Sequence, residues 1–271
     1  MSILDPNLTT LAFCWRVERR DGVCIGFTTH DRDIEIGDLS YRAAPGMLPS
    51  AISVSDGFEA DTLDVSGALT SEAITAEDLD TGRWDGAAVS IFLVDWEQPE
   101  AGQVDLASGA LGDVSAHSGG FTAELRGPTA ELDRPVVEQT SPECRAELGD
   151  KRCRVDMAAR VLVTRVVAVP GDVAVEVAAA SMGANAYGYG RLRWLSGGNS
   201  ALESELVSSD GRVLRLREAP PFDPAVGDLV EIREGCDKRF FTCRVRFANS
   251  ANFRGEPYLP GMDLLTRYPG A

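Results

Sequence analysis

The sequence has few lysines and histidines and no long apolar run. Only 2 of its 271 residues are histidine, and of its 26 basic residues only Lys151 and Lys238 are lysines. No stretch approaches the roughly 20 apolar residues that a membrane-spanning helix needs, so we expect no stable membrane insertion. Residues 1–6 lack the basic region and the apolar stretch of a secretory signal, which predicts folding inside the cell.

Common catalytic and nucleotide-binding signatures are also missing. The sequence contains no Gly-x-Ser-x-Gly, Walker loop, His-Glu-x-x-His or Rossmann fingerprint, and its spacing nominates no serine–histidine–acid triad. The sequence has 42 acidic and 26 basic residues, which gives a net charge of −16. Such a charge argues against specific nucleic-acid binding. Nothing in these patterns requires an enzyme.

The negative charge is concentrated in the first half of the chain. Residues 1–140 carry 25 acidic and 8 basic residues, whereas residues 141–271 carry 17 and 18. The length corresponds to about two domains at roughly 150 residues each. We therefore predict an acidic domain over 1–140, a second domain over 141–248 and an extended arm over 249–271. The arm is broken by proline and glycine but carries several apolar residues, so we expect it to pack on its own domain or on a neighbouring subunit.

Alternation of apolar and polar residues predicts strands along most of the chain. The first two candidate strands flank Asp21-Gly22, a sequence typical of hairpin turns. A loop over residues 20–22 with Gly22 left-handed pairs Trp15 with Phe27. A two-residue turn would instead place the two apolar faces on opposite sides of the ribbon, so we predict the three-residue loop.

The remaining strands and the few helix signals complete the fold prediction. Strands are predicted at residues 11–19, 23–28, 89–96, 119–126, 160–169, 173–179, 202–208, 211–217 and 228–233. Helix signals are few and short: the segment 70–79, which is expected to begin with a capped turn, and a turn at 129–132. Residues 178–186 are rich in small side chains and predict neither helix nor strand. Many short strands separated by turn residues predict a mainly β protein with two barrel- or sandwich-like domains.

The cysteines are the strongest chemical signal. They are Cys14, Cys24, Cys144, Cys153, Cys236 and Cys243. In the predicted hairpin, Cys14 and Cys24 are four rungs apart, on the order of 13 Å, which is too far for a disulfide. We therefore expect these two to be small core or surface side chains.

The other four cysteines form two pairs, Cys144 with Cys153 and Cys236 with Cys243. The absence of an export signal disfavours disulfides, and separated pairs in an intracellular protein more often hold a metal. Zinc knuckles usually place about two to four residues between paired ligands, whereas an iron–sulfur cube tolerates the longer spacings found here. The spacing favours iron–sulfur but leaves zinc, free thiols and disulfides open.

Basic residues flank these cysteines in an otherwise acidic protein. They are Arg145, Lys151, Arg152, Arg154, Lys238, Arg239 and Arg244. A cluster of four iron and four sulfide ions held by four thiolates carries a net negative charge, and nearby cations stabilise it. The placement of both lysines beside cysteines therefore has a candidate physical reason.

A polar segment follows the predicted hairpin and contains His30, Asp31, Arg32 and Asp33. An imidazole among carboxylates is a candidate general base or metal ligand. A dense polar cluster at a strand end is more often a hydrogen-bonded turn. The competing function is a cell-wall hydrolase or peptidase that uses His30 with Asp31 or Asp33.

Several segments resemble a family of prophage-encoded tail proteins. They are residues 26–34, 82–87, 94–96, 124–127, 144–150, 235–238, 253–255 and 260–261, with Cys153, Cys243 and Asn249. These segments follow the family's order over almost the whole chain. They are similar to the tail-tip hub proteins of bacterial gene transfer agents, and the carboxy-terminal half resembles the lambda-type minor tail protein L.

The resemblance implies a structural role in a virion-like particle. Such hub proteins form a ring, usually a trimer, in the tail baseplate of a particle assembled in the bacterial cytoplasm. The ring joins the distal tail ring to the central tip or fibre protein. The resemblance further implies that Cys144, Cys153, Cys236 and Cys243 hold a 4Fe–4S cluster, and that the segment at His30 serves packing or subunit contact. The alternatives are the hydrolase or peptidase and a zinc-stabilised interaction module.

Overall fold

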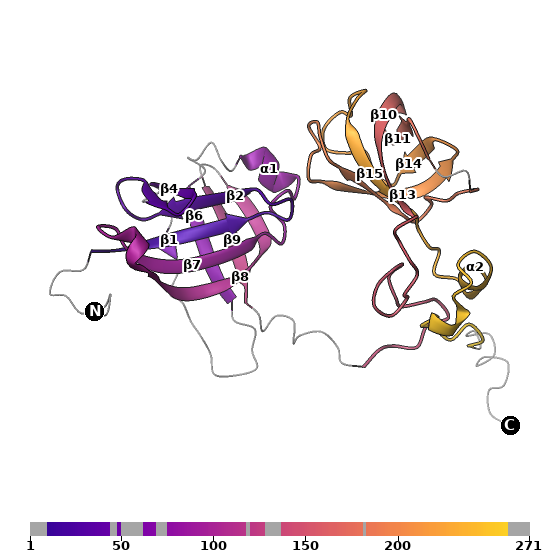
Figure 1. Ribbon diagram of the computed structural model, residues 1–271, viewed down its shortest axis with the longest axis horizontal. Coiled ribbons are helices and arrows are strands. Elements are labelled where there is room, and N and C mark those ends of the chain that lie inside the picture. Colours follow the sequence, from indigo (N-terminus) through magenta and orange to yellow (C-terminus); the bar gives the residue numbers. More distant parts are fainter. Residues whose placement is uncertain are drawn as a thin grey trace. The chain divides into compact units, whose positions relative to one another are not determined.

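The computed structural model of this chain describes residues 10–43, 48–49, 62–68, 75–117, 120–127, 137–180 and 183–259. The chain divides into two compact units, residues 1–136 and 137–271 (Figure 1). The first unit is built on a nine-stranded sheet and the second on a closed six-stranded barrel. The predicted mainly β architecture with few, short helices is therefore confirmed. Within the described ranges, no helix is long and apolar enough to cross a membrane.

The first unit is one sheet with the strand order β3-β4-β2-β1-β7-β8-β9-β6-β5. Its strands are β1 (Leu11–Glu18), β2 (Cys24–Thr28), β3 (Ile34–Ile36), β4 (Leu39–Ala43), β5 (Leu48–Pro49), β6 (Thr62–Ala68), β7 (Ala88–Asp95), β8 (Gln103–His117) and β9 (Gly120–Arg126). Its described helices are α1 (Ala76–Asp80) and the 3-10 turn η1 (Pro99–Ala101). All neighbouring strands are antiparallel except β2 and β4, which are parallel.

The first hairpin has the predicted register. Trp15 lies opposite Phe27, and both side chains are almost completely buried. The Arg19 N–H donates to the Val23 carbonyl at 2.9 Å, which closes the three-residue loop with Gly22 at φ 88°. A slip of one residue would expose the buried face, so burial fixes the register.

Side chains from both faces of this sheet are buried. One core contains Trp15, Trp84 and Ile91, and another contains Cys14 and Phe92. Both faces are therefore covered at the centre of the sheet. Cys14 and Cys24 are free, and Cys14 is fully buried. The register pairs Cys14 with Thr28 and Cys24 with Glu18, four rungs apart as predicted.

The long strand β8 is the main element that the hydrophobic pattern did not predict. It is rich in glycine, alanine and serine, which are weak strand formers, yet it pairs with both β7 and β9. A Cβ atom at Gly109 would lie 2.4 Å from the Arg126 carbonyl oxygen. Because β9 approaches so closely, this position of β8 needs glycine. The strand β8 therefore lacks the apolar alternation that marks most strands.

The helix signals are only partly within the described residues. Thr75 caps α1, and its hydroxyl accepts a hydrogen bond from the Asp78 N–H at 3.1 Å. A short helix is therefore confirmed within the predicted segment, with its cap at Thr75. Residues 70–74 and the turn expected at 129–132 lie outside the described residues.

The barrel of the second unit closes in the order β10-β11-β14-β13-β12-β15. Its strands are β10 (Val161–Gly171), β11 (Ala174–Val177), β12 (Arg191–Trp194), β13 (Glu203–Asp210), β14 (Val213–Leu216) and β15 (Leu229–Arg233). Alternate residues point inward, and Leu192, Trp194 and Ile232 are fully buried. Because β10 pairs with β15, the first and last strands of the barrel are neighbours. The chain enters and leaves the barrel at one place.

The segments on either side of the barrel in sequence, 137–159 and 234–259, form the rest of this unit (Figure 1). They contain the helix α2 (Phe240–Val245) and the 3-10 turn η3 (Ser250–Asn252). The start of the predicted arm folds back here, because the ring of Phe253 packs edge-on against Phe240 at 5.1 Å. We call these two segments together the four-cysteine region.

Candidate metal centre

Backbone hydrogen bonds join the two segments of the four-cysteine region. The Cys144 N–H donates to the Lys238 carbonyl at 2.9 Å, and the Arg145 N–H donates to the Arg254 carbonyl at 2.9 Å. These bonds bring the start of the second unit against its end, although the whole barrel separates them in the sequence. The two cysteine pairs therefore belong to one region of the structure.

An ion pair reinforces this junction. Arg145 donates from its two terminal nitrogens to the two carboxylate oxygens of Glu256, at 2.8 and 3.0 Å. The Ser141 N–H donates to the same carboxylate at 2.9 Å. The Arg145 guanidinium, followed by the Ser141 N–H, lowers the pKa of Glu256 to about 2. Glu256 is therefore ionised over the whole physiological range.

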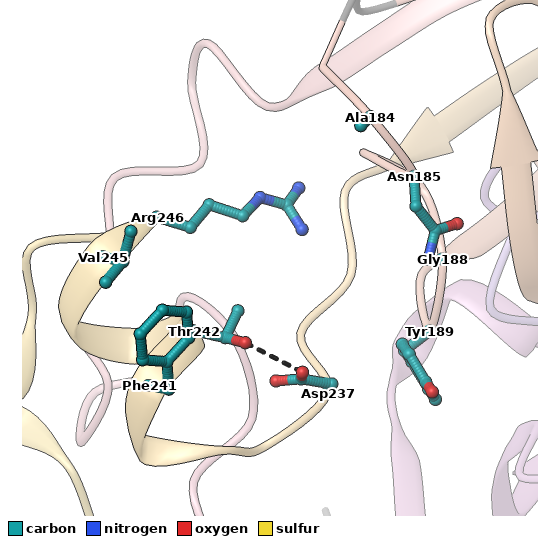
Figure 2. A pocket seen from close by; sticks show the side chains of 9 residues that line it. All are labelled: Ala184, Asn185, Gly188, Tyr189, Asp237, Phe241, Thr242, Val245 and Arg246. Carbon is teal, nitrogen blue, oxygen red and sulfur yellow. Dashed lines mark hydrogen bonds between the residues drawn. The ribbon is translucent and has the colours of Figure 1, made fainter.

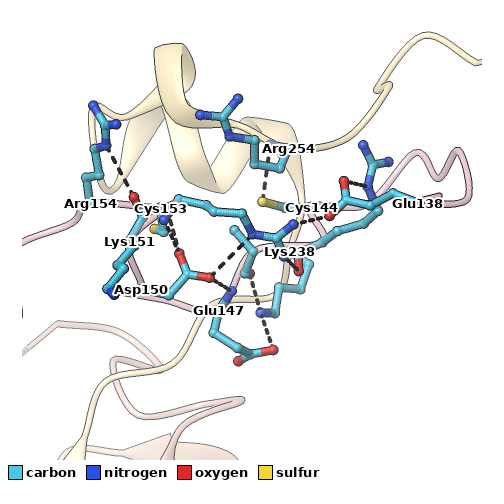
Figure 3. Close-up of polar contacts among 12 residues, drawn as sticks. Glu138, Cys144, Glu147, Asp150, Lys151, Cys153, Arg154, Lys238 and Arg254 are labelled. Carbon is cyan, nitrogen blue, oxygen red and sulfur yellow. Dashed lines mark hydrogen bonds and ion pairs between the residues drawn. The ribbon is translucent and has the colours of Figure 1, made fainter. Parts of the chain in front are cut away.

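The loop between the first two cysteines is organised by Asp150. Its carboxylate accepts hydrogen bonds from the N–H groups of Glu147 at 2.9 Å, Arg152 at 2.8 Å and Cys153 at 2.6 Å (Figure 3). Burial acts to raise the pKa of Asp150, but these N–H groups outweigh it and the pKa is lowered. A carboxylate that gathers three N–H groups fixes the turn that presents Cys153.

The second pair is presented by the start of α2. The Asp237 carboxylate accepts from the Arg239 N–H at 3.0 Å and from the Thr242 hydroxyl at 2.8 Å. These bonds fix the chain just before the helix, and Cys243 lies on the buried side of that helix. Lys238 connects the two segments, because its ammonium donates to the Ala146 carbonyl at 2.6 Å.

Three of the four sulfurs form a hydrogen bond. N–H donors meet two of them, and a third thiol donates to a carbonyl. The bonds run from the Arg254 N–H to Cys144 Sγ at 3.4 Å (Figure 3), from Asn249 Nδ2 to Cys153 Sγ at 3.6 Å, and from Cys243 Sγ to the Asn249 carbonyl at 3.3 Å. N–H donors directed at sulfur stabilise thiolate ligands.

The four thiols also affect one another electrostatically. Burial, and then the proximity of Cys144, Cys236 and Cys153, raises the pKa of Cys243 to about 11. Burial likewise raises the pKa of Cys236. The thiols of Cys236 and Cys243 are therefore protonated at neutral pH, and a bound metal would have to displace their protons.

A single metal ion needs ligands that lie close together. Among the described residues, no three His, Cys, Asp or Glu side chains are grouped to hold one ion, and all six cysteines are free. A tetrahedral zinc site with Zn–S bonds of about 2.3 Å brings its sulfurs to within about 3.8 Å of one another. The four thiols are thus gathered in one region, but not with the spacing of a zinc site.

The attachment of this region to the barrel was not predicted from the sequence. Glu234 accepts hydrogen bonds from Arg160 at 2.6 Å and from Arg246 at 2.9 Å. The guanidinium carbons of these two arginines lie 4.9 and 4.8 Å from the centre of the Phe247 ring. Arg246 also donates to the Ala186 carbonyl at 2.6 Å. The carboxylate and the ring therefore hold the four-cysteine region on the barrel.

The polar segment after β2 forms a hydrogen-bonded turn. His30 Nδ1 accepts from the Arg32 N–H at 3.1 Å and lies 3.3 Å from an Asp31 carboxylate oxygen. The His30 ring stacks on Trp96 at 4.9 Å, so two of the segments that carried the family resemblance meet here. Asp33 accepts from the Ala43 N–H at 2.8 Å. Each of these side chains thus has a structural contact.

Comparisons with known proteins place the chain among phage tail proteins. Residues 1–156 match the family described as baseplate hub protein, N-terminal attachment domain. Residues 185–263 match the family described as phage conserved hypothetical protein BR0599. A chain in the solved virion of a native gene transfer agent particle is 39% identical, with a TM-score of 0.82 over 98% of this chain and 93% of that chain. A comparison with curated proteins found no match.

These findings define a structural component of the tail of a phage-like particle, which assembles with other tail proteins. The first family covers more than half of the sequence, and the solved virion chain is similar over nearly all of it. This chain belongs to the baseplate hub protein family. The resemblance found in the sequence is thereby confirmed.

Proposed function

We propose that the chain is a connecting hub that forms a trimeric ring, joins the distal tail ring to the central tip or fibre protein, and is assembled into tails in the bacterial cytoplasm. The observation that carries this proposal is the match of residues 1–156 to an attachment domain of baseplate hubs. The second compact unit then remains available for a different neighbour. Imaging of particles that carry a label on this chain tests the position, and truncation before Ala251 is expected to abolish assembled tails.

We further propose that Cys144, Cys153, Cys236 and Cys243 hold a 4Fe–4S cluster with a structural role. Such a cluster, when bound, supplies a covalent cross-link between the two segments that flank the barrel. By analogy with a disulfide that closes a long loop, the cross-link disfavours the unfolded chain by about 4 kcal/mol. The N–H donors at the sulfurs and the junction of Arg145 with Glu256 orient the thiolates for this cross-link.

The spacing of the cysteines in the sequence supports iron–sulfur over zinc. Eight residues separate Cys144 from Cys153 and six separate Cys236 from Cys243, more than the roughly two to four of a zinc knuckle. A polynuclear core reaches ligands that lie farther apart than a single ion does. The sulfur-directed N–H groups also match the hydrogen bonding that stabilises iron–sulfur clusters.

The test is an iron and acid-labile sulfide assay on anaerobically purified protein, with its visible absorption spectrum. We expect about four iron and four sulfide ions per chain, the content of a cube held by four thiolates. Cys236→Ser should lose this content, whereas Cys24→Ser should retain it because Cys24 lies outside the four-cysteine region. Stoichiometric zinc without iron would reject the cluster.

We also propose that the chain has no catalytic role. His30 is engaged with the Arg32 N–H and stacked on Trp96, which supports a structural turn. A zymogram on peptidoglycan tests the hydrolase alternative. A lytic band that disappears in His30→Ala would show that the turn is an active site.

A further inference from the structure

A groove of about 260 Å³ lies between α2 and the loop at residues 184–189 (Figure 2). Figure 2 shows Phe241 and Val245 on the helix, with Tyr189 on the opposite loop. The polar members include Asp237, which is hydrogen-bonded to Thr242. One wall therefore belongs to the four-cysteine region and the other to the barrel.

The apolar residues of this groove are unusually exposed. Phe241, Val245 and Tyr189 have 67%, 61% and 60% of their surfaces accessible. Phe241 and Val245 are four residues apart and lie on the same face of α2, whereas Cys243 is buried. Large apolar side chains gathered at an exposed groove mark an interaction surface, and aromatic residues dominate the binding energy of such surfaces.

The helix that forms one wall of the groove carries exposed positive charge. Arg239 caps α2 and Arg244 lies within it, three residues after Phe241, and neither forms an ion pair within the described part of the chain. The nearby Arg246 is instead paired with Glu234. The carboxylate of Asp237 already accepts hydrogen bonds from the Arg239 N–H and Thr242. Two unpaired arginines in a protein with a net charge of −16 favour a ligand that carries carboxylates.

The barrel wall is held in a conformation that ordinary residues rarely adopt. Asn185 and Tyr189 have φ values of 48° and 62°. The Asn185 side chain accepts from the Ser209 N–H at 2.8 Å, and the Tyr189 N–H donates to the Leu206 carbonyl at 2.8 Å. The wall is therefore fixed before any ligand arrives, and strained conformations of this kind concentrate at functional surfaces.

We propose that this groove binds an acidic segment of a neighbouring tail protein, a different chain, and that the segment inserts an apolar side chain between Phe241 and Tyr189. The inference rests on the proposed hub role, because that role places other tail proteins next to this unit. It also links docking to the four-cysteine region, since α2 carries both Cys243 and one wall of the groove. Loss of the metal centre would then weaken the contact.

The test places a photoreactive phenylalanine analogue at position 241 in assembled particles. Phe241 is replaced by a residue of similar shape, so the contact is retained, and mass spectrometry identifies the segment that is cross-linked. We expect a segment of another tail protein that is rich in Asp and Glu. The same analogue at position 226 is the control, because Val226 is 70% exposed and lies outside the groove.

Substitutions measure the strength of the contact. Phe241→Ala and Arg244→Glu should each lower the amount of this chain in purified particles by at least about tenfold, whereas Arg244→Lys should retain most of it. The melting temperature and metal content of Phe241→Ala should equal those of the unchanged protein, because this side chain is exposed.

The outcomes separate this inference from the hub role. Cross-links from position 241 to this same chain, in one copy or another, would overturn the proposed partner, and so would the absence of cross-links in particles that contain the labelled chain. If particles contain neither the two labelled variants nor the unchanged chain, the hub role itself is refuted. This inference then fails with it.

Discussion

Arg145 and Glu256 lie 111 positions apart in the sequence and form a two-point ion pair, with nitrogen–oxygen distances of 2.8 and 3.0 Å. The pair joins the segment that carries Cys144 to the segment that follows Cys243. It therefore orients the two halves of the candidate metal centre without taking part in ligation. The contribution of this ion pair to the stability of the fold can be measured through the titration of Glu256.

The ion pair predicts an acid-sensitive second unit. The pKa of Glu256 is lowered from 4.5 to about 2 in the folded chain, mainly by Arg145. A carboxyl whose pKa is lower when folded stabilises the native state above its unfolded pKa. This stabilisation should be lost as the pH falls from about 4.5 through about 2. Thermal unfolding between pH 7 and pH 2 measures it.

Glu256→Gln isolates the contribution of this carboxyl from that of other acids. The variant should be less stable than the unchanged protein at pH 7, and the difference should shrink as the pH falls toward 2. Glu218→Gln is the matched control, since Glu218 is an exposed carboxyl of the same unit. An equal difference at every pH would contradict the assignment.

Asp150 predicts a strong effect from a single loop residue. Asp150→Ala removes the acceptor of three N–H groups, of which the Cys153 N–H is partly buried, and one unsatisfied buried donor costs about 1–3 kcal/mol. We expect a lower melting temperature for the second unit and a reduced metal content, because the turn that presents Cys153 loosens. Asp172→Ala, in an exposed turn, should change neither. A full metal content in Asp150→Ala would show that the turn forms without the carboxylate.

Metal removal should affect the two units differently. The first unit has its own cores, whereas the candidate ligands all lie in the second. Chelation or oxidative loss of the metal should therefore lower only the melting transition of the second unit, by a loss of about 4 kcal/mol. Calorimetry before and after removal checks this. An unchanged pair of transitions would argue against a structural metal.

Gly109 predicts a steric effect inside the first unit. Gly109→Ala places a Cβ atom 2.4 Å from the Arg126 carbonyl oxygen, so β8 and β9 must separate, at a cost of about 1–3 kcal/mol. Gly171→Ala is the control, because a Cβ atom there meets nothing within 4 Å. Urea unfolding of both variants measures the cost. Equal stability of the two would show that the sheet adapts freely.

The parts of the fold that were predictable are those in which local pattern and burial agree. The register of β1 and β2 follows from the apolar faces of Trp15 and Phe27, which burial keeps together. In the second unit, strands β10, β13, β14 and β15 alternate clearly and were found close to their predicted positions. In these segments the hydrophobic period alone identifies the strand.

Other elements depend on contacts that no local pattern encodes. The glycine-rich β8 forms because β7 and β9 flank it. The parallel pairing of β4 with β2 likewise depends on the path of the chain between them. At the candidate centre, spacing and charge identified the cysteines, but not Asn249 or the Arg254 N–H, which approach the sulfurs only after the chain has folded back. The contact of Glu234 with Arg160 and Arg246 is similarly long-range.

The adjacency of β10 and β15 has a consequence for how such hubs diversify. The Glu234 N–H donates to the Arg160 carbonyl at 3.0 Å, so the stretch from one residue to the other is a self-contained insert with touching ends. Loops of this insert are free to lengthen, shorten or be exchanged without altering the spacing of the four cysteines. Changes in these loops can therefore alter which partner is recognised, while the four-cysteine region stays the same.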